Sequence, residues 1–191
     1  MASPRTLLLV AAALTAGCAG ASRSTAPSPN PQANPAAANR AIEAARALAG
    51  KKEIVVGGVS YGEGCSALVR AAYQQAGRTL PAGSGDVRSL HALASAENSL
   101  RKGRPAPGDL VFLSDRPGGQ PEHVGLVEKV GDGGTVTVLH RTSRGVIRMR
   151  VNGVQPWKAR GDDGQILNDV LVVGGGRVPA GRLLVAYATL L

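Results

Sequence analysis

Apolar residues recur at helical spacing in the first half of the chain. Over residues 66–75 they are three or four positions apart, which places Leu68 and Ala72 on one face. Asn39 and Asp86 are residue types that cap helices, and each comes before another run of this kind. The pattern therefore predicts three helices, over residues 40–49, 66–75 and 87–94.

In the second half the pattern becomes that of β-strands. Residues 109–113 are apolar on both faces, as in the central strand of a sheet. Residues 135–140 and 145–151 alternate between apolar and polar positions, and a glycine-rich hairpin turn at 131–134 precedes the first of them. The pattern predicts five strands, over residues 109–113, 123–130, 135–140, 145–151 and 183–190. Helices followed by antiparallel strands indicate an α+β fold, with N-terminal helices packed on a central antiparallel sheet.

Two segments have weaker patterns. Residues 54–56 are a short apolar run that we expect to be extended, and it leads into Gly57 and Gly58. Residues 152–181 are rich in loop-forming residues, and the pattern does not place an element there. Trp157 is the one large apolar side chain that can anchor this loop.

The N-terminus is typical of an exported protein. Arg5 is followed by apolar residues 7–14, a run too short to span a bilayer as a mature helix. The Leu-Thr-Ala-Gly-Cys sequence after it resembles the signal of bacterial lipoproteins, in which the cysteine, here Cys18, is lipidated and becomes the new N-terminus. An ordinary secretory signal with an incidental cysteine is the alternative. Because Ala19 rather than Asp follows Cys18, we expect a lipid-anchored envelope protein in the outer membrane or periplasm.

These features divide the chain into three parts. We expect residues 1–17 to be a lipoprotein-type signal peptide and residues 18–35 to be a linker. The linker is composed of small and polar residues without an apolar period, so it should be flexible. Residues 36–191 are then a single folded domain.

The formal charge of +9 suggests an anionic partner. A basic exported protein suits cell-wall polymer or lipid headgroups. Nucleic acid also attracts basic proteins, but the chain has few aromatic residues for base stacking and no dense run of Lys and Arg. We therefore expect the cell wall and a membrane as partners, no nucleic acid, and a monomer.

The chain has two cysteines, and Cys65 stands where a helix is predicted to begin. The positive end of a helix favours a thiolate over a thiol. If Cys18 carries lipid, Cys65 cannot form an intramolecular disulfide, and a lone thiol in an exported protein calls for a role. The rival is a Cys18–Cys65 disulfide, which would tether the linker to the domain. These observations favour Cys65 as a nucleophile.

Two of the three histidines fall at one end of a predicted hairpin. His123 starts its strand and His140 ends the next, so antiparallel pairing should bring them together. An imidazole can activate a cysteine, and a third group can orient that imidazole. The spacing therefore predicts a catalytic site of Cys65, His123 and His140, without a metal or other cofactor.

Two other chemistries fit parts of the sequence. A zinc site made by Cys65, His123 and His140 is chemically acceptable, but the spacing lacks a compact ligand pair. Ser60 stands in a Gly-Val-Ser-Tyr-Gly sequence that matches the nucleophile elbow of α/β-hydrolases. That fold places several strands before the elbow, whereas one predicted helix and a short extended segment precede Ser60. We rank both below thiol catalysis and keep the serine hydrolase as a minor alternative.

Three further polar residues receive structural roles. We expect His91, on a predicted helix, to be a surface or core residue. Asp109 should hold the turn before its strand. Glu122 should point to the opposite strand face from His123, because neighbouring side chains alternate.

Four motifs, taken in order, resemble the NlpC/P60 family of papain-like cysteine peptidases of bacterial cell walls. They are Gly-Cys-Ser-Ala-Leu-Val at 64–69, Pro-Gly-Asp-Leu-Val-Phe at 107–112, His-Val-Gly-Leu-Val at 123–127 and Leu-His at 139–140. The resemblance implies a papain-like NlpC/P60 fold and cleavage of peptide bonds in peptidoglycan stem peptides. It implies that Cys65 is the nucleophile, His123 the general base and His140 the group that orients His123. It also implies that Tyr61, Gly64 and Ser66 contact the substrate.

Two alternatives stay open beside this resemblance. The related CHAP amidases and endopeptidases have a similar motif order, but their third residue is usually Glu, Asn or Asp, so His140 favours NlpC/P60. The family usually has Asp where this chain has Gly64, and Ile54 stands near the place of a family Tyr. These departures suggest a non-catalytic envelope-binding lipoprotein on the same fold as the alternative from another class.

Overall fold

The computed structural model describes residues 34–191. The predicted signal peptide, the lipidation of Cys18 and nearly all of the predicted linker lie outside these residues. The first described element is already a helix, and it begins at Pro35, the last residue of the predicted linker.

Residues 34–191 contain three α-helices: α1 (Pro35–Ala47), α2 (Ser66–Gln75) and α3 (Val87–Ala96). The prediction for α2 is confirmed at both ends. Helix α3 begins as predicted, with Asp86 as its cap, and ends two residues later. None of the helices in this part of the chain is long and apolar enough to cross a membrane.

The start of α1 differs from the prediction, and Asn39 is not its cap. Asn34 caps the helix instead, because its side-chain oxygen accepts hydrogen bonds from two N–H groups of the first turn at 3.0 and 3.4 Å. Pro35 follows directly, and proline suits the first helical position because its φ is already helical and an N–H is not needed there. The alanines after it favour the helix.

The described residues form one large antiparallel sheet with the strand order β3-β10-β4-β5-β6-β7. Its strands are β3 (Leu100–Arg101), β4 (Leu110–Ser114), β5 (Pro121–Val130), β6 (Thr135–Thr142), β7 (Gly145–Asn152) and β10 (Leu184–Ala188). The five predicted strands are confirmed as β4, β5, β6, β7 and β10. Strand β3 has two residues, too few to give a hydrophobic pattern.

Two short hairpins lie outside this sheet, and of their strands only the extended segment expected over residues 54–56 was predicted. They are β1 (Val55–Val56) with β2 (Val59–Ser60), and β8 (Val170–Val173) with β9 (Gly176–Pro179). Gly57 and Gly58 join the first pair with φ of 58° and 78°, and Gly174 and Gly175 join the second with φ of 58° and 80°. A two-residue turn with positive φ at both positions matches the twist of a hairpin, and glycine adopts it without strain. The Gly-Gly pairs are therefore the sequence signal for both hairpins.

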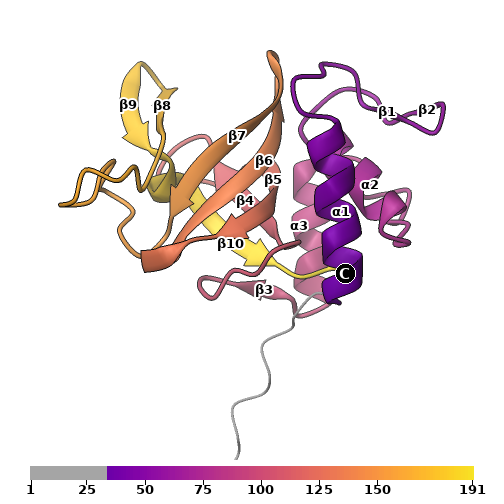
Figure 1. The fold of residues 1–191 in the computed structure, drawn as a ribbon, viewed down its shortest axis with the longest axis horizontal. Coiled ribbons are helices and arrows are strands. Elements are labelled where there is room, and N and C mark those ends of the chain that lie inside the picture. Colours follow the sequence, from indigo (N-terminus) through magenta and orange to yellow (C-terminus); the bar gives the residue numbers. More distant parts are fainter. Residues whose placement is uncertain (1–33) are drawn as a thin grey trace, which may run out of the picture.

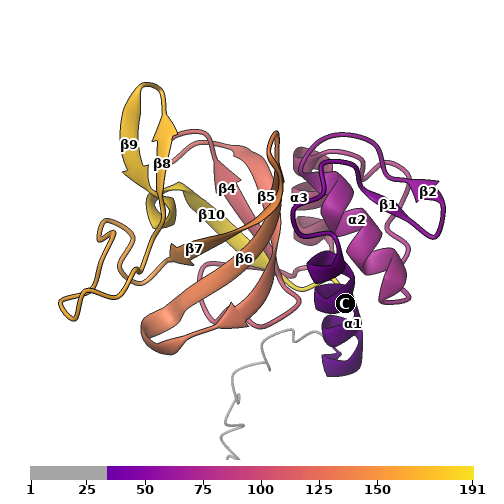
Figure 2. The same cartoon turned by 45° about the horizontal axis from the view of Figure 1, so that its top comes forward.

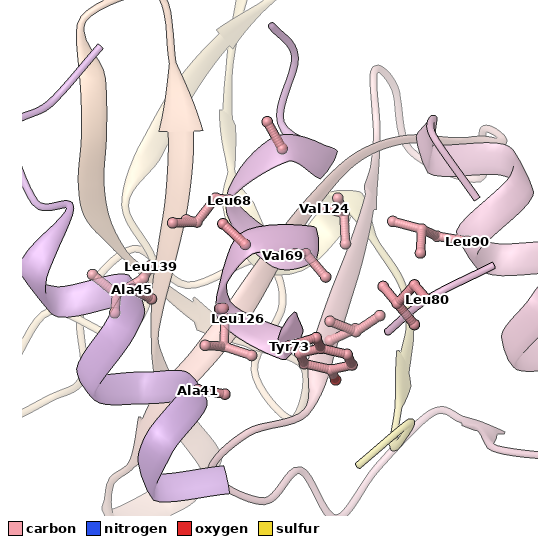
Figure 3. Close-up of a cluster of buried hydrophobic side chains, with 14 of the residues drawn as sticks. Ala41, Ala45, Leu68, Val69, Tyr73, Leu80, Leu90, Val124, Leu126 and Leu139 are labelled. Carbon is pink, nitrogen blue, oxygen red and sulfur yellow. The ribbon is translucent and has the colours of Figure 1, made fainter. Parts of the chain in front are cut away.

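The central sheet buries both of its faces. Figures 1 and 2 show α1, α2 and α3 on one side of the sheet and the β8–β9 hairpin on the side away from the helices. The helix-side core contains Tyr73 of α2 and Leu126 of β5 (Figure 3), and the core on the other side contains Val127 of β5 and Tyr187 of β10. Neighbouring residues of β5 thus belong to different cores, which explains why the strands are apolar at consecutive positions.

Two carboxylates have the structural roles that we expected. Asp109 is fully buried, and burial raises the pKa of its carboxyl group. Its carboxylate accepts hydrogen bonds from three donors: the Ala106 N–H, the Arg101 guanidinium and the Thr189 hydroxyl. It therefore holds the turn before β4. Glu122 accepts a hydrogen bond from Arg88 of α3, so its side chain points to the helix side of the sheet.

Glu128 of β5 joins helix α1 to the sheet. Its side chain is 6% exposed and accepts hydrogen bonds from Arg148 of β7 at 2.7 and 2.9 Å and from Arg46 of α1 at 2.6 Å. Chiefly the Arg148 hydrogen bonds, and then those of Arg46, lower the pKa of Glu128 below its ordinary value. A carboxyl group with a lowered pKa stabilises the fold above its unfolded-state pKa, and this stability is lost as the pH falls through the folded-state pKa.

Replacing Glu128 by Gln should lower the free energy of unfolding at pH 7 by about 1–3 kcal/mol, the usual contribution of hydrogen bonds to a charged group. The difference should shrink below about pH 4, because the wild-type carboxylate is then protonated. Glu97→Gln is the control, since the Arg78–Glu97 pair is 39% and 38% exposed and should contribute at most about 1 kcal/mol. Urea unfolding at pH 7 and pH 3 measures both variants, and equal losses at pH 7 would contradict the role of Glu128.

Candidate active site

Cys65 lies at the N-terminus of α2, as predicted. It occupies the cap position of the helix, and it is half-buried. Gly64 before it has a φ of 95°, a left-handed conformation that glycine adopts without strain. Ser66 after it is buried, and its hydroxyl donates a hydrogen bond to the Gly85 carbonyl at 2.6 Å. The chain on both sides of the thiol is therefore held in place.

His123 and His140 meet within the sheet. His123 Nε2 and His140 Nδ1 are 2.7 Å apart, and the two rings meet edge to face with their centroids 4.9 Å apart. Gly125 of β5 lies opposite His140 of β6, so the predicted pairing of the two strand ends is confirmed. A Cβ at Gly125 would lie 2.5 Å from Val138 Cγ1 and 3.1 Å from His140 Cβ. The glycine thus allows β6 to approach closely enough for the two rings to touch.

The Cys65 thiol lies against the strand that carries His123. The N–H of the next residue, Val124, donates a hydrogen bond to this thiol. Val69 of α2 and Val124 of β5 belong to the same hydrophobic core (Figure 3), and Cys65 packs against that core. The structure therefore places the Cys65 thiol against β5 beside Val124 and brings His123 and His140 together, while the approach of His123 to the thiol stays a prediction.

Burial opposes the effect of the helix on the thiol. Burial is the largest influence on Cys65, and it raises the pKa of the thiol. The N–H groups of Val124, Cys65 and Ser66 and the positive charge of Arg141 lower this pKa by less. The helix N-terminus therefore acts in the expected direction, but the prediction that it makes thiolate the favoured form is wrong for the half-buried thiol.

Both histidines of the site are neutral at pH 7. Burial lowers the pKa of His123 to about 4. Burial is also the main cause that lowers the pKa of His140 to about 4, and the nearby His123 lowers it further while Asp169 raises it. A neutral imidazole has one nitrogen that can accept a proton. Because His123 Nε2 is directed at His140, the nitrogen of His123 that remains for another partner is Nδ1.

Sequence reasoning does not single out Arg141, which lies beside the loop that carries the thiol. Its Nε donates to the Lys52 carbonyl at 2.9 Å, and its Nη1 contacts the Gly64 carbonyl at 3.5 Å. Side chains alternate along a strand, so Arg141 and His140 point to opposite faces of β6. That alternation is the signal that could have placed Arg141 on the side of the cysteine helix. Asp169 had no such signal, because it precedes the hairpin that the pattern missed.

The three residues expected to contact substrate, Tyr61, Gly64 and Ser66, make different contacts with the rest of the protein. Tyr61 is half-buried against the helix-side core, and its N–H donates to the Ile54 carbonyl at 2.9 Å. The Gly64 carbonyl accepts a hydrogen bond from Arg141, and the Ser66 hydroxyl donates its hydrogen bond to the Gly85 carbonyl. Contact with substrate stays a prediction for all three.

The other candidate residues have different surroundings. Ser60 is exposed on β2, outside the central sheet, whereas a nucleophile elbow turns sharply from a central strand into a helix. His91 packs edge to face on Phe112, with centroids 5.1 Å apart, as expected for a core histidine. Within residues 34–191, no group of three or more His, Cys, Asp and Glu residues is arranged to hold a metal ion.

Comparison with known proteins gives one family. The model of the NlpC/P60 family matches residues 51–162, which is more than half of the chain and includes Cys65, His123 and His140. A solved structure of an NlpC/P60 family protein from Bacillus cereus is 20% identical, with a TM-score of 0.45, over 84% of this chain and 40% of its own. This chain thus spans less than half of that protein's length, and no curated protein matches it. By the family match, the chain belongs to the NlpC/P60 family.

Proposed function

We propose that this protein is a cysteine hydrolase of the cell envelope that cleaves peptide bonds in peptidoglycan stem peptides. Membership of NlpC/P60 supports cell-wall hydrolysis in general. The observation that carries the proposal is the 2.7 Å contact between His123 Nε2 and His140 Nδ1, next to the strand residue whose N–H binds the Cys65 thiol. A thiol, a base and a group that orients the base are the parts that nucleophilic catalysis by cysteine needs.

The reaction has two halves. His123 Nδ1 takes the thiol proton as Cys65 Sγ attacks the carbonyl carbon, and the oxyanion forms beside the backbone N–H of Cys65. His123 then gives the proton to the departing amine, the C–N bond breaks, and a thioester remains on Cys65. Water adds to the thioester, His123 takes the water proton, and the C–S bond breaks. The carboxyl product leaves, and the proton returns to Sγ.

Burial shapes how this reaction starts. With a raised pKa on the thiol and lowered pKa values on both histidines, the resting site holds a neutral thiol and neutral imidazoles. His123 then acts as a general base during the attack, rather than as an imidazolium already paired with a thiolate. The charges that form are stabilised by the N–H groups at the start of α2 and by His140.

A second candidate function is binding without catalysis. The observation that favours it is the raised pKa of the Cys65 thiol, because a reactive cysteine usually has a lowered pKa. Such a protein would be an envelope-binding lipoprotein on the same fold. A CHAP-type amidase or endopeptidase is the nearest enzymatic alternative, and a His rather than an acidic or amide residue at position 140 speaks for peptidase chemistry of the NlpC/P60 kind.

We also propose that the protein is exported and anchored to the envelope by lipid on Cys18, with residues 18–35 as the spacer. The support is the resemblance of residues 14–18 to a lipoprotein signal and the basic charge of the chain. Nothing in this proposal depends on the catalytic site, so it has its own test.

Cys65→Ala should abolish the cleavage of purified peptidoglycan, a loss on the order of 10³-fold or more because the attacking atom is missing. Mass spectrometry of the released fragments measures this and identifies the bond, and circular dichroism checks the fold. Ser60→Ala is the control and should retain activity. Activity that survives in Cys65→Ala but is lost in Ser60→Ala would select the serine hydrolase. Wild-type protein that sediments with peptidoglycan without releasing fragments would select the binding protein.

The acid limb of kcat/KM should lie near pH 4. His123 is neutral and able to accept a proton above its pKa of about 4, and it loses this ability as the pH falls through that value. A solvent-exposed histidine would place the limb near about 6.5. Muropeptide cleavage measured from pH 3 to pH 8 tests this, with His91→Gln as a control that should not move the limb. A limb near 6.5 would contradict a buried base.

Cys18→Ser should remove lipid attachment and release the protein from membranes. Metabolic labelling with a fatty-acid analogue, followed by membrane fractionation, measures both effects. The wild type should be labelled and sediment with the membranes, whereas the variant should not be labelled. Equal labelling of the two proteins would show that Cys18 is not the lipidated residue.

A further inference from the structure

One ring nitrogen of the histidine pair has no use in the site described so far. His140 is 5% exposed, and its Nδ1 is directed at His123. Its other nitrogen, Nε2, is buried and finds no hydrogen-bond partner among residues 34–191. Buried polar atoms are nearly always paired, so this nitrogen suggests a group that binds there.

The proton positions needed for catalysis make this nitrogen a donor. For His123 Nδ1 to accept the thiol proton, the hydrogen of neutral His123 must sit on Nε2. That hydrogen is then donated to His140 Nδ1, 2.7 Å away, so the hydrogen of neutral His140 must sit on its Nε2. The base form of the pair therefore leaves a buried N–H without an acceptor, which is unfavourable. An acceptor at His140 Nε2 would remove this cost.

Two cavities of about 470 and 270 Å³ are lined by His140 on the side of the sheet away from the helices. Both are lined by His140, Met149 of β7 and Leu171 of β8, so they adjoin along the β8 strand. We call this combined space the His140 groove. One wall is strand β8, which lies after residue 162 and hence outside the segment that matches the family model.

The charges of the His140 groove favour an anion. Arg144, in the exposed turn between β6 and β7, lines the larger cavity and has no ion pair among the described residues. The one carboxylate in the lining, Asp169, is paired with Arg150, whose side chain and N–H donate to it at 3.0 and 2.8 Å. Arg148 also lines the cavity, and its guanidinium is paired with Glu128.

We propose that the His140 groove binds a carboxylate, which accepts the Nε2–H of His140 and so holds the histidine pair in the form that serves as a base. The proposal rests on the proposed function, because it concerns the same histidine pair. A carboxylate fits better than a neutral acceptor because it also meets Arg144 and stabilises the positive charge that His123 gains during the reaction. Burial, joined at His140 by the nearby His123, leaves both imidazoles weak bases with pKa values of about 4, even though Asp169 already raises the pKa of His140. A further anion beside the pair raises these pKa values. The carboxylate comes either from the substrate peptide itself or from a separate molecule.

Alkylation of Cys65 by iodoacetamide tests the proposal without a known substrate. The rate at pH 7 is measured in the full-length protein against rising concentrations of N-acetylglycine, and against N-acetylglycinamide, its uncharged counterpart. N-acetylglycine should raise the rate about tenfold and to a plateau, because it supplies the missing acceptor. The amide should have little effect. No saturable increase with the carboxylate, or an equal increase with the amide, would overturn the proposal.

Two arginine variants locate the effect. Arg144→Gln should raise the half-saturating concentration of N-acetylglycine by about tenfold, because it removes the cation of the groove. Arg177→Gln is the matched control, because Arg177 is exposed on β9 and does not line either cavity. If Arg144→Gln and Arg177→Gln change the half-saturating concentration of N-acetylglycine equally, the carboxylate binds elsewhere and the proposal is overturned.

Nitrogen-15 spectra of labelled histidine give an independent readout. On addition of N-acetylglycine, the long-range couplings of His140 should report a protonated Nε2 and an accepting Nδ1, and the same nitrogens should shift in Cys65→Ala. Unchanged His140 signals would overturn the proposal. Muropeptide cleavage distinguishes this outcome from a failure of the proposed function. If the protein cleaves muropeptides although the His140 signals do not change, the carboxylate proposal is wrong and the proposed function stands.

Cleavage assays then separate the two sources of the carboxylate. If the substrate's own carboxylate occupies the groove, N-acetylglycine should inhibit cleavage competitively. If a separate molecule occupies it, N-acetylglycine should accelerate cleavage of the same muropeptide. Either result supports the site, whereas cleavage that does not respond to N-acetylglycine at concentrations that saturate alkylation would count against it.

Discussion

The close approach of β6 to β5 at Gly125 is the constraint on which the site depends. Any side chain at this position would collide with Val138 and the Leu139 carbonyl and press on His140, so the strands would have to separate. With the strands apart, His140 could not reach His123, whose orientation depends on that 2.7 Å contact. The same strand, β5, also carries Val124, which binds the thiol through its N–H and packs in the core with α2. Strand β5 and its neighbour β6 thus hold the histidine pair, and β5 also meets the Cys65 thiol.

The same packing determines the electrostatics of the site. Strands that touch so closely exclude water, and burial then disfavours every charged form, which raises the pKa of the thiol and lowers those of both imidazoles. A helix N-terminus and Arg141 act in the opposite direction but contribute less. In a buried site of this kind, fixed hydrogen-bond donors and charges stabilise the charges that develop during the reaction. These electrostatic interactions are stronger because water is excluded.

Local patterns predicted the elements that carry the site, and tertiary packing decided what they could not predict. Helix α2 and the β5–β6 hairpin follow from apolar spacing, and the meeting of His123 and His140 follows from antiparallel pairing alone. The net pKa of Cys65 does not follow from its place on a helix, because burial depends on how the helix packs. Asn39 and Asn34 are both good caps, and the proline and alanines after Asn34 decide between them. The β8–β9 hairpin, by contrast, had a readable signal in its Gly-Gly turn.

Strand β6 joins the two halves of the site because its neighbouring residues act on opposite faces. On the helix side, Arg141 contacts the carbonyl groups of Lys52 and Gly64 and so holds the loop that presents the thiol. On the other side, His140 orients His123 and borders the cavities beneath the β8–β9 hairpin. A displacement of β6 would therefore disturb the loop that carries Cys65 and the histidine pair together. This coupling gives a reason for the extensive pairing of β6 with both β5 and β7, since a strand held on both edges keeps the two residues in fixed relation.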